Sequence, residues 1–345
     1  MKQGARCLEL AERGYSLVEV MVALVLTCVI MASVYGMLRR GQESAMREPE
    51  ISALQQSARG GLSMLDRDLT LAGFKTPGAM AVSWHDGGGA VPDEITIVYA
   101  DPEVPTAETR VCRRGLPCEL IHQSSVLNLN PGSLAPKQED PETAYSTDVL
   151  LLAVESSDCN HDEKIGIYPF RVTREPRLGR NGGLSALLVD HEPVPLSEVW
   201  QLTDNFNNEL HPDCTIIGGF HLVQYRVHPM PPDPHPNLER RDLSLGEEWM
   251  PVAANIENLQ FTYATGSSKD FMDSPPYPIP IDPMTWVTRV KVTVAGRSES
   301  ANLRGSSKGR FFNDDAHVRK SFSTTVSLRN LVAQVQEQTK SRIYN

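Results

Sequence analysis

The sequence lacks the short motifs that mark the common enzyme and nucleotide-binding families. It has no G-x-S-x-G, no phosphate-binding P-loop, no H-E-x-x-H and no G-x-G-x-x-G. The Asp-Gly-Gly-Gly run at 86–89 is a turn signal that is not followed by Lys and Ser or Thr. The nine histidines are scattered along the chain. We therefore expect neither an enzyme nor a bound cofactor.

Basic charge is also scarce. The 345 residues include 33 Lys and Arg against 43 Asp and Glu, a formal net charge of −10, and no long basic stripe. Nucleic-acid binding draws much of its affinity from Lys and Arg at phosphates, so no nucleic-acid partner is expected. The 40% hydrophobic content excludes a disordered chain. A mean hydropathy of −0.29 excludes many membrane spans.

One apolar segment stands out against these averages. Residues 20–38 contain no charged side chain, and Arg39 and Arg40 follow them. The segment has the length of one membrane-spanning helix, which needs ~20 apolar residues. The charges that precede it have both signs, so the positive-inside rule gives no clear orientation. These charges are Lys2, Arg6, Glu9, Glu12 and Arg13.

Three interpretations of this N-terminus compete. A cleaved signal peptide has a shorter apolar core and a small-residue cleavage site, which this segment lacks. A plain membrane anchor leaves Glu19 unexplained, because a carboxylate inside an apolar helix costs about 3 kcal/mol. In the third interpretation a polar leader ends at Gly14 and the apolar segment begins at Tyr15. Glu19 is then the fifth residue after the break.

The run R-G-Y-S-L-V-E at Arg13–Glu19 resembles the cleavage motif of type IV pilins and pseudopilins. The resemblance implies that a prepilin peptidase cuts between Gly14 and Tyr15 and N-methylates Tyr15, where Phe is usual. It also implies that Glu19 pairs with the N-terminal amine of a neighbouring subunit. Opposite charges attract far more strongly in hydrocarbon than in water, so such a pair would favour assembly.

Further stretches resemble the minor pilins of the PilW type. Residues 65–74 are similar to that family's L-x-R-D-L-R-x-A-G-[YF] segment, with Thr70 where Arg is frequent. Residues 252–263 are similar to its V-A-x-x-I-E-x-L-Q-x-x-Y segment, and residues 326–330 to its closing V-x-L-R-N. The middle of the chain, about 75–250, shows no such similarity.

Helical periodicity continues beyond the apolar segment. Pro49 should kink or interrupt this helix, and Gly73 is a suitable stop. We expect Asp66, Arg67 and Asp68 to form a solvated face of it. Apolar residues recur at steps of three and four, and the last three of them should lie in the core. They are Ile51, Leu54, Ala58, Leu62, Leu65, Leu69 and Ala72.

After Phe74 the pattern changes to short strand-like runs separated by turns. Proline-rich segments at 229–236 and 275–283 should be stiff exposed loops. The fold class expected is therefore α+β and type IV pilin-like, with a long N-terminal helix packed on a largely antiparallel β-sheet domain. The strands expected are 95–100, 149–154, 165–172, 184–189, 220–227, 256–263, 286–294 and 322–328, and a short helix at 330–339 closes the chain.

The expected organisation has four parts. A leader peptide covers 1–14, and the transmembrane and assembly helix covers 15–38. An amphipathic continuation of that helix covers 39–74, and a periplasmic β-rich globular domain covers 75–345. Cleavage would remove three basic and two acidic side chains, which leaves a mature net charge of −11.

Four of the six cysteines lie in the region expected to be periplasmic, where disulfides persist. Four cysteines allow three pairings, of which we favour Cys112 with Cys118 and Cys159 with Cys214. The C-x5-C spacing without a second ligand pair is poor for zinc. Cys28 lies in the apolar helix as a small apolar side chain.

A weaker metal pattern surrounds Cys159. Asp158, Asn160 and Asp162 place oxygens at alternate positions, as a calcium loop does. Glu163 stands where such a loop requires Gly, so a solvated acidic turn is favoured and no metal site is expected.

The resemblance implies a minor pilin that takes part in pilus assembly and priming near the tip, and in twitching motility. The chain would span the bacterial inner membrane once, with its globular domain in the periplasm, and later enter the pilus at the cell surface. The implied partners are prepilin peptidase, other minor pilins, the major pilin, a large tip adhesin, and membrane lipid before assembly. The alternatives are a minor pseudopilin of a type II secretion system and a membrane-anchored periplasmic enzyme or ligand-binding domain.

Overall fold

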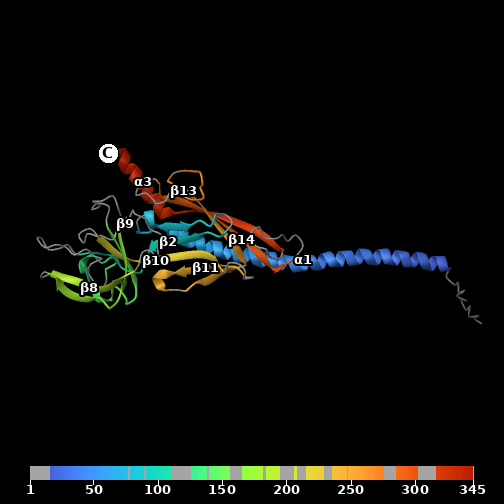
Figure 1. Ribbon diagram of the computed structural model, residues 1–345, viewed down its shortest axis with the longest axis horizontal. Helices are drawn as coiled ribbons and strands as arrows, with labels where there is room; N and C mark the ends of the chain where they lie inside the picture. Colours follow the sequence, from blue (N-terminus) through green and yellow to red (C-terminus); the bar gives the residue numbers. More distant parts are fainter. Residues whose placement is uncertain are drawn as a thin grey trace, which may run out of the picture.

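The computed structural model shows one long N-terminal helix that leads into a β-rich head (Figure 1). This confirms the expected α+β architecture. The residues that it describes are 16–76, 78–88, 91–109, 126–137, 140–155, 165–181, 184–194, 206–207, 215–228, 235–246, 248–266, 268–275, 285–301 and 316–344.

The described elements follow the order helix, sheets, helix. The α-helices are α1 (Leu17–Leu71) and α3 (Arg329–Tyr344), and the 3-10 turns are η1 (Gly78–Met80), η3 (Pro131–Ser133), η4 (Pro141–Thr143) and η7 (Leu243–Leu245). The strands are β1 (Val82–His85), β2 (Glu94–Ala100), β3 (Ala107–Glu108), β4 (Val126–Leu129), β5 (Leu150–Glu155), β6 (Ile165–Val172), β7 (Arg177–Asn181), β8 (Leu184–Pro193), β9 (Phe206–Asn207), β10 (Thr215–His228), β11 (Asn237–Asp242), β12 (Met250–Ala254), β13 (Ile256–Thr265), β14 (Val287–Ala301) and β15 (His317–Ser327).

Helix α1 runs for 55 residues and ends next to Gly73, whose φ of +73° suits glycine. The expected interruption at Pro49 is wrong, because the helix continues through it. Pro49 and Ala45 are both exposed. The carbonyl of Ala45, which loses its usual amide partner, can therefore be hydrated. At the other end, Asn330 Nδ2 lies 3.3 Å from each of the last three carbonyls of the helix, those of Thr70, Leu71 and Ala72.

Two antiparallel sheets form the head. The larger has twelve strands, with the order β1-β2-β10-β5-β6-β8-β4 and with β11 and β12 extending from β10. The smaller has the order β13-β14-β15. Among the described strand pairs only β6 with β9 is parallel. The sheets are therefore largely antiparallel, as expected.

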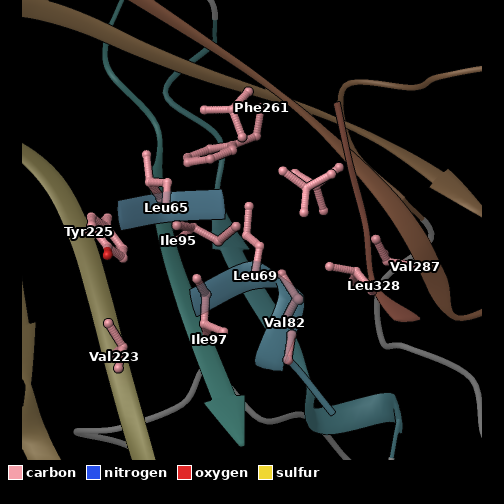
Figure 2. Packing of buried hydrophobic residues seen from close by; sticks show 14 of the residues in the cluster. Leu65, Leu69, Val82, Ile95, Ile97, Val223, Tyr225, Phe261, Val287 and Leu328 are labelled. Atoms are coloured by element: carbon pink, nitrogen blue, oxygen red, sulfur yellow. The ribbon is translucent and has the colours of Figure 1, made fainter. Parts of the chain in front are cut away.

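The C-terminal half of α1 packs between the two sheets. Leu65, Leu69 and Ala72 are fully buried, as the periodicity predicts. Gly61 allows the helix to approach the large sheet closely, since a Cβ there would lie 2.9 Å from Leu238 Cδ2. Figure 2 shows the two leucines among labelled side chains of both sheets: Ile95, Ile97, Val223, Tyr225, Phe261 and Val287.

A second apolar cluster fills the end of the head far from the protruding helix (Figure 1). We call this part the distal lobe and define it as β3 to β9 with residues 215–219 of β10. The rest of the head is the proximal body. Strand β10 belongs to both parts: it pairs with β5 up to Gly219 and with β2 from Phe220 onward.

Candidate functional site

The N-terminal part of α1 extends away from the head, and no other described part of the chain covers it (Figure 1). Every side chain from Ser16 to Gln42 is exposed. Within the described residues, α1 is the one helix long and apolar enough to cross a membrane. Its exposed large apolar side chains lie on all sides: Leu17, Val18, Val20, Met21, Val22, Leu24, Val25, Leu26, Val29, Ile30, Met31, Val34, Tyr35, Met37 and Leu38. Such a surface needs a membrane or other protein helices around it.

Two hydroxyl groups of this segment, those of Thr27 and Ser33, are satisfied inside the helix. Thr27 Oγ1 donates to the carbonyl of Ala23 at 2.8 Å, and Ser33 Oγ donates to the carbonyl of Val29 at 2.9 Å. Hydroxyls bonded in this way need no water, so they are compatible with hydrocarbon. Glu19 is the only charged side chain of residues 17–38.

Glu19 lies in the first turn of α1. Ser16 caps this end in an extended conformation, and its Oγ accepts a hydrogen bond from the backbone N–H of Glu19 at 3.2 Å. A carboxylate in a first turn is favoured by the partial positive charge of the helix N-terminus. The Glu19 side chain is exposed and has no ion pair with any described residue. It is therefore accessible to a positive group from outside the chain.

The other predicted site residues lie outside the described residues. These are the cleavage pair Gly14 and Tyr15, the disulfide candidates Cys112, Cys118, Cys159 and Cys214, and the calcium candidates Asp158, Asn160 and Asp162. Their roles stay predictions. Within the part of the chain that the structure describes, no group of three His, Cys, Asp or Glu could hold a metal ion.

The expectation that Asp68 is solvated is wrong. Its side chain is 4% exposed and joins α1 to the large sheet. Tyr225 Oη of β10 donates to Asp68 Oδ2 at 2.6 Å, and Arg240 Nε of β11 donates to the same oxygen at 3.0 Å. Burial, and then the charge of Asp68, raise the pKa of Tyr225, so the phenol keeps its proton and remains a donor.

Helical spacing could have located this residue. Asp68 lies three residues after Leu65 and four before Ala72, on the edge of the buried stripe. Because Asp66 and Arg67 stand directly before it, Asp68 resembles part of a solvated charged face. Asp66 and Arg67 are exposed, as expected.

Comparison with known proteins adds one sequence feature. The family model described as "Prokaryotic N-terminal methylation motif" matches residues 10–35 of the chain. No curated protein matches. Among solved structures, the chain is similar to the type IV-like pilin TTHA1219 from Thermus thermophilus, with 11% identity over 53% of this chain and 86% of that chain. The TM-score of that superposition is 0.19, which is too low to assign a function.

Proposed function

We propose that this chain is a type IV pilus subunit of the minor, PilW-like kind, which acts in pilus assembly through subunit interfaces and not through catalysis. One observation carries the proposal: an exposed apolar helix that bears a single carboxylate, at the fifth position after Gly14, and is continuous with a folded head. The methylation motif at residues 10–35 covers the same segment.

In this proposal, prepilin peptidase cuts between Gly14 and Tyr15 and methylates the new N-terminus. The apolar helix first spans the inner membrane with the head in the periplasm. It then leaves the lipid to pack among the helices of other pilins, where Glu19 pairs with the terminal amine of a neighbouring subunit. An unpaired carboxylate is unfavourable in hydrocarbon, so this pairing favours the filament over the membrane.

The size of the head supports a position of the subunit near the tip. A head with a distal lobe beyond its proximal body suits a terminal subunit better than a repeated one in a filament wall. We therefore place it with other minor pilins near the tip, beside an adhesin. The alternative is a minor pseudopilin of a type II secretion system, for which the N-terminal helix would work in the same way.

The N-terminus of the mature chain provides the first test. Mass spectrometry of the protein purified from its native host should give a chain that begins with N-methylated Tyr15. An unprocessed Met1, or a cut at another bond, would refute the proposal. Deletion of the gene should then abolish twitching, whereas loss of protein secretion with normal twitching would favour the pseudopilin alternative.

Glu19→Val tests the assembly step. The variant should insert into the membrane at the wild-type level, because it only removes a charge from the span, but it should be absent from sheared pili. Glu48→Val is the matched control, since Glu48 is exposed on the same helix beyond the apolar segment. Wild-type incorporation of Glu19→Val, or equal loss with Glu48→Val, would contradict the role of Glu19.

A further inference from the structure

His221 lies on β10 where this strand passes from the distal lobe to the proximal body. It is two residues beyond Gly219, the last residue paired with β5. A second segment, residues 101–106, makes the same passage from β2 to β3. The two passages are joined by the backbone N–H of Asp101, which donates to the carbonyl of Gly219 at 3.0 Å.

The imidazole of His221 lies between two carboxylates from different elements. Its Nδ1 is 2.7 Å from Asp242 Oδ2, at the end of β11. Its Nε2 is 3.4 Å from Asp101 Oδ2, just after β2. The ring of Tyr99 lies beside it, with 5.0 Å between ring centroids. The His221 side chain is only 19% exposed, so these contacts are partly shielded from water.

The two carboxylates differ in burial and in the hydrogen bonds that they accept. Asp242 is 1% exposed, and its Oδ1 accepts hydrogen bonds from the backbone N–H of Ser244, at 3.0 Å, and from the Ser244 hydroxyl. Asp101 is half-buried, and its other oxygen accepts the backbone N–H of Glu103 at 2.8 Å. Asp242 is thus a fixed partner of His221 and Asp101 a movable one.

The geometry decides which nitrogen of His221 loses a proton first. The short bond to Asp242 keeps the proton on Nδ1, because the carboxylate is an acceptor only. Deprotonation therefore takes place at Nε2. The contact with Asp101 then changes from a cationic ring beside a carboxylate to a neutral ring whose Nε2 lone pair lies 3.4 Å from a carboxylate oxygen, which is unfavourable.

We propose that His221 is a proton-operated clasp within the proximal body, at its junction with the distal lobe. Protonated, it holds Asp101, at the start of the segment that leads into the lobe, together with Asp242 of β11. Neutral, it keeps Asp242 and releases Asp101, which loosens the segment 101–106. This segment is seated tightly on β10 by Val104, since a Cβ added at Gly219 would lie 2.4 Å from Val104 Cβ. Release of Asp101 therefore loosens the chain at the point where it enters the distal lobe.

The charges around His221 raise the pH at which the clasp opens. The hydrogen bond with Asp242 raises the pKa of His221 above 6.5, burial opposes this, and the charges of Asp242 and Asp101 add to the rise. Arg240 of β11 lowers this pKa, although its own guanidinium is paired with Asp68 of α1. The clasp is therefore closed below the raised pKa of His221 and opens as the pH increases through it.

The test uses the full-length chain in detergent micelles. Exchange of the amide hydrogens of Asp101, Glu103, Val104 and Thr106, the non-proline residues of 101–106, is measured from pH 5.5 to 8.5, relative to a peptide from β14 that corrects for the intrinsic pH dependence. The His221 ring is titrated in parallel by NMR. Protection of 101–106 should fall as His221 loses its proton, by about tenfold for each unit by which Asp101 raises the pKa.

Three variants make the result specific. Asp101→Asn should lower the pKa of His221 and abolish the pH-dependent step in protection. His221→Gln should leave the segment loose at every pH. His228→Gln is the matched control on the same strand, because His228 is exposed and its Nδ1 is 3.7 Å from Glu239.

Protection that stays constant while His221 titrates would overturn the clasp. So would an unchanged pKa of His221 in Asp101→Asn, or a loss of the step in His228→Gln. If His221→Gln does not fold, Asp101→Asn alone decides, since it removes a half-buried charge and leaves the Asp242 network intact.

Discussion

Replacing Asp68 with Ala should destabilise the head strongly. The change removes the Asp68 carboxylate from the Arg240 guanidinium, which is 16% exposed, and removes the acceptor of the buried Tyr225 hydroxyl. Breaking a buried ion pair by removing one partner costs about 3–5 kcal/mol, because the remaining charge stays desolvated. An orphaned hydroxyl costs about 1–3 kcal/mol. Both groups share one oxygen, so the two penalties overlap and we expect about 4 kcal/mol in total.

The expected loss is a large fraction of the 5–15 kcal/mol that stabilises an ordinary domain. Equilibrium unfolding in urea, followed by near-UV circular dichroism in detergent, measures it as a change in midpoint at constant slope. Asp66→Ala is the control, since Asp66 is exposed two residues earlier on the same helix, and it should change stability by less than about 0.5 kcal/mol.

A triple variant separates the contribution of the polar network to stability from that of apolar packing. Asp68→Leu with Arg240→Met and Tyr225→Phe removes all three polar groups together, so no buried charge or donor is left unpaired. It should recover most of the stability lost in Asp68→Ala. A loss below about 1 kcal/mol in Asp68→Ala, or a triple variant as unstable as the sum of its parts, would refute the reasoning.

Three further predictions concern single side chains. Burial lowers the pKa of His191 to about 4, opposed by Asp190, and neither ring nitrogen has a partner among the described residues. The pKa of a histidine in the unfolded chain is near 6.5, so the free energy of unfolding should fall by about 3 kcal/mol as the pH drops from 6.5 to 4. The His191→Phe variant should lose this pH dependence, which urea titrations at several pH values measure. Asn330→Ala should lower the urea midpoint by the equivalent of about 1 kcal/mol, because it uncaps α1, whereas Gln336→Ala on an exposed face should not. Gly78→Ala should cost about 1–3 kcal/mol by thermal denaturation, since its Cβ would lie 2.1 Å from the Trp286 ring.

The sequence predicts the elements whose patterns are regular. The steps of three and four from Leu54 to Ala72 place the buried face of α1, and the alternation in β13 and β14 predicts their inward sides. All eight strands expected from the sequence are present, and α3 covers the expected terminal helix.

Strand β11 shows why other elements escape prediction. Its sequence Asn-Leu-Glu-Arg-Arg-Asp has too many charges for a strand in the middle of a head. Its charges have partners outside the strand: Arg240 contacts Asp68 of α1, and the Arg241 guanidinium stacks 4.4 Å from the centre of the Trp249 ring. Such compensation depends on strand register and cannot be read from local composition.

In the candidate site too, some residues can be recognised from the sequence and others cannot. Glu19 is recognisable because it interrupts an otherwise apolar run. His221 and its partners are invisible in the sequence, because Asp101 lies 120 residues before it and Asp242 lies 21 residues after it. Only the pairing of β10 with both β2 and β11 brings the three together.

The cap that Asn330 places on α1 sets the order in which the chain can mature. The first helix emerges from the ribosome early. The Asn330 side chain that caps its last carbonyls, and the Leu331 side chain that packs against Gly73, are synthesised near the end of the chain. Strands β14 and β15, which cover the same helix, are also late. The apolar end of α1 is thus made before the head can close. A chain that stops short of residue 328 would carry the apolar helix on an unfinished head, a species that is open to proteolysis.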